Sequence, residues 1–101
     1  MAILNFKKAG CHLILTSGGT GFAPRDVTPE ATLGLITKRA DQLVMYMNNE
    51  AVKIAPTACL SRGVIGMIDN TMIVNLPGKP KAVTENFEIL MRKNVIVHAI
   101  A

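Results

Sequence analysis

Apolar residues occur along the chain in short runs that glycine, proline and polar residues separate. Residues 11–16, with the sequence CHLILT, form a run rich in leucine and isoleucine that predicts a strand buried on both faces. The glycine-rich residues 17–22 then form a loop. Thr28, Pro29 and Glu30 follow as a hydroxyl N-cap, a proline at the first helical position and an acid in the first turn, which predicts the start of a helix.

The predicted helix carries one apolar stripe. Its apolar side chains alternate between spacings of three and four, and they are Leu33, Ile36, Ala40, Leu43 and Met47. This stripe predicts one helix, or two joined helices, that reach Asn48. Asn48 and Asn49 are predicted to end the helix, because asparagine tolerates the left-handed backbone conformation.

The second half of the chain contains two β-branched runs and another helical pattern. Residues 64–68 and 72–76 are separated by Asp-Asn-Thr, a composition typical of a turn, and they predict an antiparallel hairpin. Residues 80–93 show apolar side chains at helical spacing after a proline, which predicts a helix. Residues 95–101 fit a strand by propensity and a buried terminal helix equally well.

Strands alternate with helices in this pattern, so the sequence predicts an α/β fold with a central sheet. The chain has 101 residues, of which 50% are hydrophobic, and this length suits one domain. No apolar run reaches the roughly 18 residues that a membrane-spanning helix needs. The first lysines follow the apolar residues, the reverse of a secretory signal, so a cytoplasmic protein is predicted.

The net charge of +4 is scattered in small clusters, with one tyrosine and no tryptophan for base stacking. This pattern argues against a nucleic-acid surface and suits small anionic ligands. Cys11 and Cys59 are predicted to be buried free thiols. His12 and His98 have no cysteine or carboxylate at ligand spacing, which argues against a zinc site. Five methionines are interpreted as core filling, namely Met45, Met47, Met67, Met72 and Met91.

Gly18, Gly19 and Gly21 lie between the first predicted strand and the first predicted helix, an arrangement that favours bound anions. Alone, such glycines are as typical of a plain turn as of an anion-binding loop. They match neither the Walker A spacing nor the dinucleotide fingerprint. Arg25 and Asp26 follow, with a forked donor for phosphate and hard oxygens for magnesium. Two alternatives are that these residues pair with each other, or that Asp26 caps the loop.

The string TSGGTGFAPRDVTPEAT at residues 16–32 resembles the signature of the molybdopterin adenylyltransferase family, which includes the Mog proteins and the gephyrin G domain. The resemblance continues at Leu60, Ser61 and Arg62, where the family has a Leu-Ser-Arg element. It extends through NLPGKPKA at residues 75–82 and covers nearly the whole chain.

The resemblance implies an α/β fold with three layers, α/β/α, in which a mainly parallel sheet carries an antiparallel hairpin. Residues 1–101 would then form a partial molybdenum cofactor biosynthesis domain, truncated before its N-terminal strands. The resemblance favours a helix for residues 95–101 and implies a homotrimer. Asp41 and Gln42 stand where the family commonly has a Pro-Gly break, which favours joined helices.

The activity that the resemblance implies is transfer of an adenylyl group from ATP to the terminal phosphate of molybdopterin, with magnesium and release of pyrophosphate. By position, Asp26 is the catalytic and metal-binding aspartate. The implied substrate-binding residues are Gly18, Gly19, Thr20, Gly21, Arg25, Ser61, Asn75, Pro77 and Gly78. Without the N-terminal strands we expect weak activity from this chain alone. A gephyrin-like scaffold or binding module and an inactive fragment are the alternatives.

Overall fold

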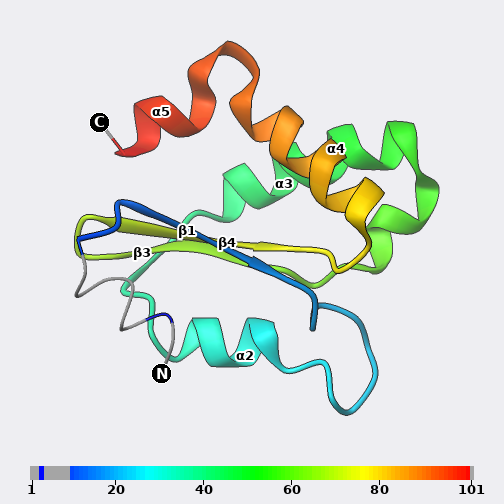
Figure 1. Cartoon of the computed structure of the whole chain (residues 1–101), viewed down its shortest axis with the longest axis horizontal. Helices are drawn as coiled ribbons and strands as arrows, with labels where there is room; N and C mark the ends of the chain where they lie inside the picture. Colours follow the sequence, from blue (N-terminus) through cyan, green and yellow to red (C-terminus); the bar gives the residue numbers. More distant parts are fainter. Residues whose placement is uncertain (1–2, 4–9, 101) are drawn as a thin grey trace.

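The computed structural model describes residue 3 and residues 10–100. Figure 1 shows a sheet seen along its edge, with helices above and below it. The elements in chain order are β1 Leu13–Ser17, α2 Thr28–Leu33, β2 Lys38–Arg39, α3 Asp41–Ile54, the 3-10 helix η1 Pro56–Leu60, β3 Ile65–Ile68, β4 Thr71–Leu76, α4 Pro80–Met91, the 3-10 helix η2 Arg92–Asn94, and α5 Val95–Ile100.

The described strands form one sheet in the order β1-β4-β3-β2. β1 and β4 are parallel, with Leu13 opposite Met72 and Ser17 opposite Leu76, so these two strands end at the same edge. β4 pairs antiparallel with β3, and β3 pairs antiparallel with β2, so one of the three pairings among the described strands is parallel, whereas the resemblance implies a mainly parallel sheet. The predicted hairpin is confirmed. Its turn holds Asp69 at φ 51°, a conformation that aspartate adopts more readily than most residues.

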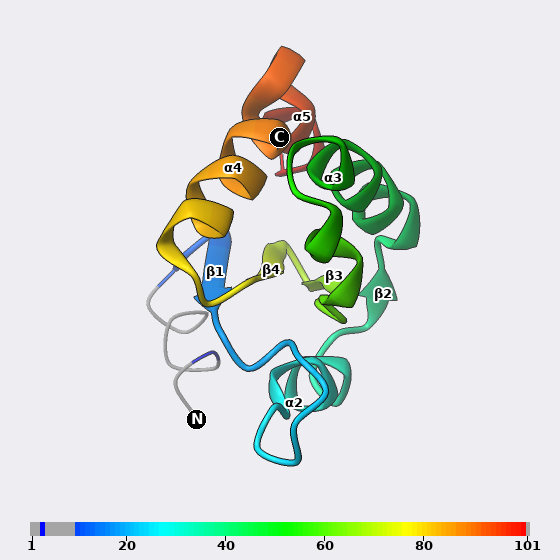
Figure 2. The same ribbon diagram turned by 90° about the vertical axis from the view of Figure 1, so that its right-hand side faces the viewer.

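Helices cover both faces of the sheet, which confirms the α/β class and the three layers (Figures 1 and 2). α2 lies on one face, and α3, α4 and α5 lie on the other. The apolar cluster on the side of α2 includes Ile14, Ile68 and Ile73. The cluster under the other three helices includes Met47, Ile65, Met72, Val74, Leu76, Leu90 and Ile96. β4 is buried along its whole length because it lies between the two layers.

The helix or joined helices predicted for residues 28–48 are instead two helices separated by strand β2, so this prediction is wrong. α2 ends at Leu33, and the backbone N–H groups of Thr37 and Ala40 then donate to carbonyl oxygens of β3, at 2.8 Å each. Ile36 packs against the cluster on one face of the sheet, whereas Leu43 packs against the cluster on the other. A spacing of three and four does not reveal that neighbouring members of a stripe face different layers.

α3 continues through Asn48 and Asn49, which the sequence predicts as its end, and it stops at Ile54. Met47 and Ala51, before and after the two asparagines, are both buried. Packing of this inner face therefore stabilises the helix through two residues of low helix propensity. α4 and α5 confirm the helices predicted for residues 80–93 and, by resemblance, for the described part of residues 95–101.

The two faces of β1 are not equally buried, which corrects the prediction of a strand buried on both. Ile14 is 6% exposed, but its neighbour Leu15 is 40% exposed. β1 stands at the end of the strand order, where the helical layers cover it less completely than they cover β4.

Some side chains predicted to be buried lie at the surface. Both cysteines are free, as predicted, but Cys11 is only half-buried and Cys59 is exposed on η1. Met45 and Met91 are also exposed, so the interpretation as core filling is wrong for these two methionines. In the described part of the chain, no helix has the length and apolar character that crossing a membrane requires.

Candidate functional site

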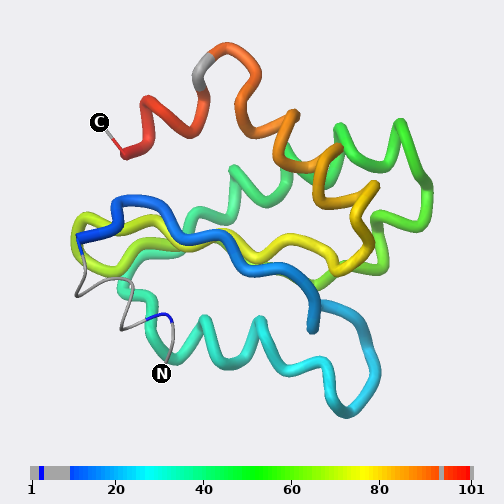
Figure 3. The backbone as a smooth tube through the Cα atoms, viewed as in Figure 1, coloured from blue at the N-terminus to red at the C-terminus, as the bar shows by residue number. Residues whose placement is uncertain are grey.

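Two loops meet at the edge of the sheet where β1 and β4 end, as the backbone trace in Figure 3 shows. The N–H of Gly18 donates to the carbonyl oxygen of Leu76 at 2.9 Å. Gly18 has φ 90°, and a Cβ atom on Gly78 would lie 3.2 Å from the Cα of Gly18. A side chain would be strained at Gly18 and crowded at Gly78. The glycines therefore allow residues 18–21 to lie beside residues 77–78.

The glycine loop then leads into α2. Gly19 has φ 70°, and its carbonyl oxygen accepts the N–H of Thr28 at 3.1 Å. A Cβ atom on Gly19 would collide with Oγ1 of Thr28. Val27 is the N-cap residue of α2, and no side chain caps the helix. The prediction of Thr28 as the hydroxyl N-cap is wrong, because Thr28 is already helical and its hydroxyl lies against Gly19.

Asp26 closes the loop between the glycines and α2. Its Oδ2 accepts the N–H of Ala23 at 3.0 Å, and a Cβ atom on Gly21 would lie 2.8 Å from the same oxygen. Its Oδ1 has no hydrogen-bond partner among the described residues. Arg25 is exposed, and no ion pair joins it to Asp26 in that part of the chain. Asp26 thus caps the loop and keeps one oxygen available for a ligand.

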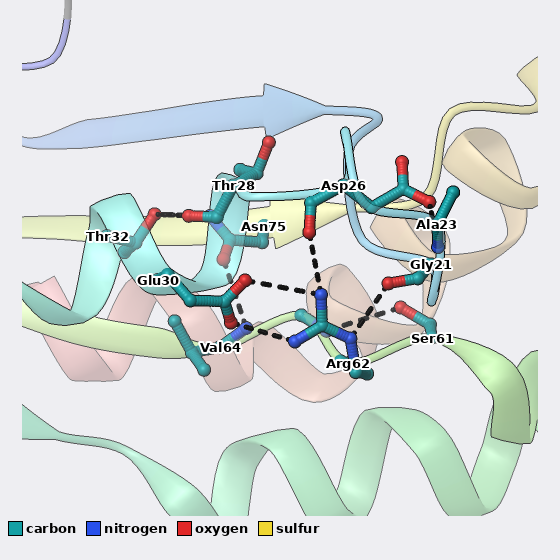
Figure 4. Close-up of polar contacts among 11 residues, drawn as sticks. Gly21, Ala23, Asp26, Thr28, Glu30, Thr32, Ser61, Arg62, Val64 and Asn75 are labelled. Carbon is teal, nitrogen blue, oxygen red and sulfur yellow. Dashed lines mark hydrogen bonds and ion pairs between the residues drawn. The ribbon is translucent and has the colours of Figure 1, made fainter.

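Arg62 joins the glycine loop to the start of α2 (Figure 4). Its Nε donates to the carbonyl oxygen of Gly21 at 2.8 Å, and its Nη2 donates to that of Asp26 at 2.7 Å. Nη1 and Nη2 also donate to the carboxylate of Glu30, at 2.8 and 3.3 Å. The backbone N–H of Arg62 donates to the carbonyl oxygen of Thr20 at 2.8 Å. One side chain therefore holds the loop at several points.

Arg62 is absent from the set of site residues that the sequence predicts. The planar guanidinium offers five N–H groups in a fixed fork, so it can bind two carbonyls and a carboxylate at once. It also lies 5.5 Å from the ring centre of Phe22, within the range of a cation–π contact. Two signals in the sequence point to this residue. One is its place in the Leu-Ser-Arg element, and the other is the acid Glu30, which has no partner nearby in the sequence.

The ion pair of Arg62 and Glu30 is expected to make stability depend on pH. Hydrogen bonding from Arg62 and then its charge hold the pKa of Glu30 below its ordinary value of 4.5. Because this pKa is lower in the folded state, the pair stabilises the fold above the unfolded pKa, and this stabilisation is lost as pH falls through the folded pKa. The difference in urea midpoint between the wild type and Glu30→Gln should therefore shrink between about pH 6 and about pH 3.

Added salt provides the control for this titration. The Glu30 side chain is 54% exposed, so about 1 M sodium chloride should reduce the difference in midpoint at the higher pH. A difference that stays constant across the pH series would show that the pair does not contribute to stability.

Asn75 is the centre of a buried polar network. Its side chain is fully buried, and its Nδ2 donates to Oγ1 of Thr16 at 2.9 Å and to Oγ1 of Thr32 at 3.0 Å. Its Oδ1 accepts the N–H of Val64 at 3.1 Å. The amide of Asn75 therefore joins β1, α2 and the segment before β3. Its role in substrate binding stays a prediction.

A cavity of about 360 Å³ opens beside the two loops. Its other walls come from the end of α3, from η1 and from the first turns of α4. Four of the predicted substrate-binding residues line it, namely Thr20, Ser61, Pro77 and Gly78. Lys79 also lines it, at the N-terminus of α4, where the helix dipole favours anions. The other predicted site residues are not on its wall, namely Gly18, Gly19, Gly21, Arg25, Asp26 and Asn75.

The fold and the site define an α/β domain in which a glycine loop and a helix N-terminus border a cavity suited to an anionic ligand. The sequence profile of the family described as "probable molybdopterin binding domain" matches residues 2–96. The chain belongs to this family.

Several relatives support this assignment. The molybdenum cofactor synthesis protein cinnamon of Drosophila melanogaster is 52% identical over 88% of this chain and 14% of its own length. The molybdopterin adenylyltransferase of Haemophilus influenzae is 45% identical over 90% of this chain and 47% of its own length. The solved Mog protein of Mycobacterium ulcerans has a TM-score of 0.88 and 38% identity, over 98% of this chain and 64% of that one. The chain thus spans less than half the length of both curated relatives.

Proposed function

We propose that this domain acts in molybdenum cofactor biosynthesis by adenylylating molybdopterin. A terminal phosphate oxygen of molybdopterin forms a bond to the α-phosphorus of ATP. The bond from that phosphorus to the oxygen of the β-phosphate breaks, and pyrophosphate leaves with the electron pair. The observation that carries the proposal is that the glycine loop and residues 77–78 meet at a cavity within the usual size range of ligand sites. The names of the relatives support it.

The phosphates of the two substrates are assigned to the loops. The N–H of Gly18 is bonded to Leu76, but the N–H groups of Gly19 and Gly21 donate to no described residue, so they are open to the close approach that phosphate sites require. Thr20 adds a hydroxyl on the cavity wall, and Lys79 adds a positive charge at the start of α4. These groups neutralise and position the reacting phosphates, which is the main contribution a protein makes to phosphoryl chemistry.

Asp26 is assigned to magnesium. Its Oδ1 has no partner among the described residues, and those residues hold no group of three metal-binding side chains. Magnesium in phosphoryl-transfer sites is commonly held by one or two carboxylates together with the substrate phosphates, so a single available carboxylate oxygen fits an ion that arrives with ATP. Such an ion supplies neutralisation of phosphate charge when it is bound. Asp26 itself keeps the loop closed through Oδ2 and presents Oδ1.

The test is to incubate the purified chain with molybdopterin and magnesium ATP and to measure adenylylated molybdopterin and pyrophosphate. We expect slow turnover, which Asp26→Asn lowers by about tenfold or more, because the variant keeps the size but loses the charge. Asp41→Asn is the matched control, since Asp41 is an exposed aspartate that pairs with Arg39. It should keep the wild-type rate within about twofold. The proposal would be overturned if calorimetry detected binding of neither molybdopterin nor ATP, and also if wild type and Asp26→Asn showed equal turnover.

A further inference from the structure

α4 forms one wall of the cavity, and this wall carries two polar side chains that have no role in the proposed phosphate binding by the loops. Glu85 and Asn86 both line the cavity, on the second turn of α4. Asn86 is only 4% exposed, and its Nδ2 donates to the carbonyl oxygen of Ala82 at 2.7 Å. A carbonyl oxygen can only accept, so this bond fixes which end of the amide is nitrogen. The oxygen of Asn86 therefore points away from the backbone of its own helix.

The amide oxygen of Asn86 is an acceptor that no donor in the described part of the chain satisfies. No hydrogen bond to Oδ1 occurs among the described residues, and the carboxylate of Glu85 likewise has no hydrogen-bond partner there. Yet every fully buried side-chain nitrogen or oxygen among the described residues has a hydrogen-bond partner. Oδ1 is therefore not sealed in the protein, and because Asn86 lines the cavity, we take Oδ1 to open onto that space. An almost fully buried amide that keeps an open acceptor is expected to be completed by a ligand or water.

The surroundings of these acceptors suit a flat ring. Four alanines line the same cavity, from α3, the junction of α3 with η1, η1 itself and α4, namely Ala51, Ala55, Ala58 and Ala82. Methyl side chains leave open space and offer apolar contact to the faces of a heterocycle. Lys79 lies seven positions before Asn86, which corresponds to about 10 Å along a helix. Phosphate and ring can therefore occupy different ends of one cavity.

We infer that Glu85 and Asn86 recognise an amine-bearing heterocycle by accepting hydrogen bonds from its N–H groups, while its phosphate lies toward the loops. This inference rests on the proposed function, because it places the ring of one of the two substrates. The pterin ring of molybdopterin and the adenine ring of ATP share the chemistry concerned, an exocyclic amine beside ring nitrogens. The two side chains orient the ring and discriminate against rings that lack the amine.

The experiment measures affinity for two matched pairs of ligands by calorimetry. One pair is pterin and lumazine, and the other is ATP and purine riboside triphosphate; in each pair only the first has the exocyclic amine. The wild type should bind the first member of one pair about tenfold more tightly, and that pair identifies which ring occupies the subsite. Asn86→Leu has similar volume without the acceptor, and it should reduce the preference to about twofold or less.

Glu85→Gln provides a second variant. Glu85 is half-buried, and its substitution leaves the hydrogen bond from Asn86 to Ala82 in place. It should also weaken the preference, whereas Glu88→Gln, on the exposed side of α4, should leave it unchanged. Lack of discrimination by the wild type in both pairs would overturn the inference, as would a preference that survives in both Asn86→Leu and Glu85→Gln. In these cases the proposed function stands if molybdopterin and ATP still bind. If neither molybdopterin nor ATP binds, the proposed function fails together with the inference.

Discussion

Replacing Arg62 with alanine is expected to loosen the glycine loop and to lower the proposed adenylylation of molybdopterin by about a hundredfold, since a displacement of about 1 Å can have this effect. The substitution removes the donors to the carbonyl oxygens of Gly21 and Asp26 and the partner of Glu30. Hydrogen exchange gives a measurement that does not depend on the reaction. The amide protons of residues 18–26 should exchange about tenfold faster or more, because local opening of the loop becomes easier.

Two further variants distinguish geometry from charge at this position. Arg62→Lys keeps the positive charge and can still pair with Glu30, but an ammonium cannot match the fork that also binds two carbonyls, so exchange and turnover should lie closer to those of Arg62→Ala. Arg39→Ala removes an exposed ion pair with Asp41, whose side chains are 59% and 63% exposed, and should change neither measurement by more than about twofold. Wild-type exchange of the loop in Arg62→Ala would show that Arg62 does not position it.

Elements that depend on neighbouring residues could be predicted from the sequence, and elements that depend on distant pairing could not. The hairpin of β3 and β4 follows from two β-branched runs around a turn, and α4 follows from a proline and a periodic apolar pattern. β2 consists of Lys38 and Arg39, both exposed, and nothing in this dipeptide indicates a strand. It exists because Thr37 and Ala40 on either side of it bond to β3, a contact that overrides local propensity.

The candidate site shows the same division. The glycine loop and residues 77–78 are each one short continuous segment, so the sequence shows both. The parallel pairing of β1 and β4 explains why the two segments meet. The side-chain contacts of Arg62 span 32 to 41 positions, so the sequence shows the donor without showing the acceptors. In the sequence, Asn86 resembles any polar residue of a helix. Only the structure shows that α4 forms a wall of the cavity and that Asn86 lines it. The long-range contacts of the site therefore could not be predicted from the sequence, because these contacts arise only when the sheet forms.

Replacing Asn75 with leucine is expected to lower the free energy of unfolding by about 3 kcal/mol, measured by urea denaturation. Leucine has a similar volume, so the main change is chemical rather than a new cavity. The N–H of Val64 and the hydroxyl of Thr16, both in half-buried residues, would lose the fully buried amide as their partner, at about 1–3 kcal/mol for each unsatisfied group. Thr32 is less affected, because its hydroxyl also donates within α2. Domains of this size unfold with about 5–15 kcal/mol, so the loss is large.

A double-mutant cycle with Thr32→Val tests whether the amide of Asn75 acts through its partners. Alone, Thr32→Val removes one acceptor of the amide, but in the Asn75→Leu background that bond is already absent, so the two effects should fall short of additivity by about 1 kcal/mol. Asn49→Ala, at an exposed position on α3, should change stability by no more than about 0.5 kcal/mol. Wild-type stability of Asn75→Leu would contradict the structural role. The buried amide beside the glycine loop would then need another explanation, and the ligand contact implied by the family resemblance would be the one to test.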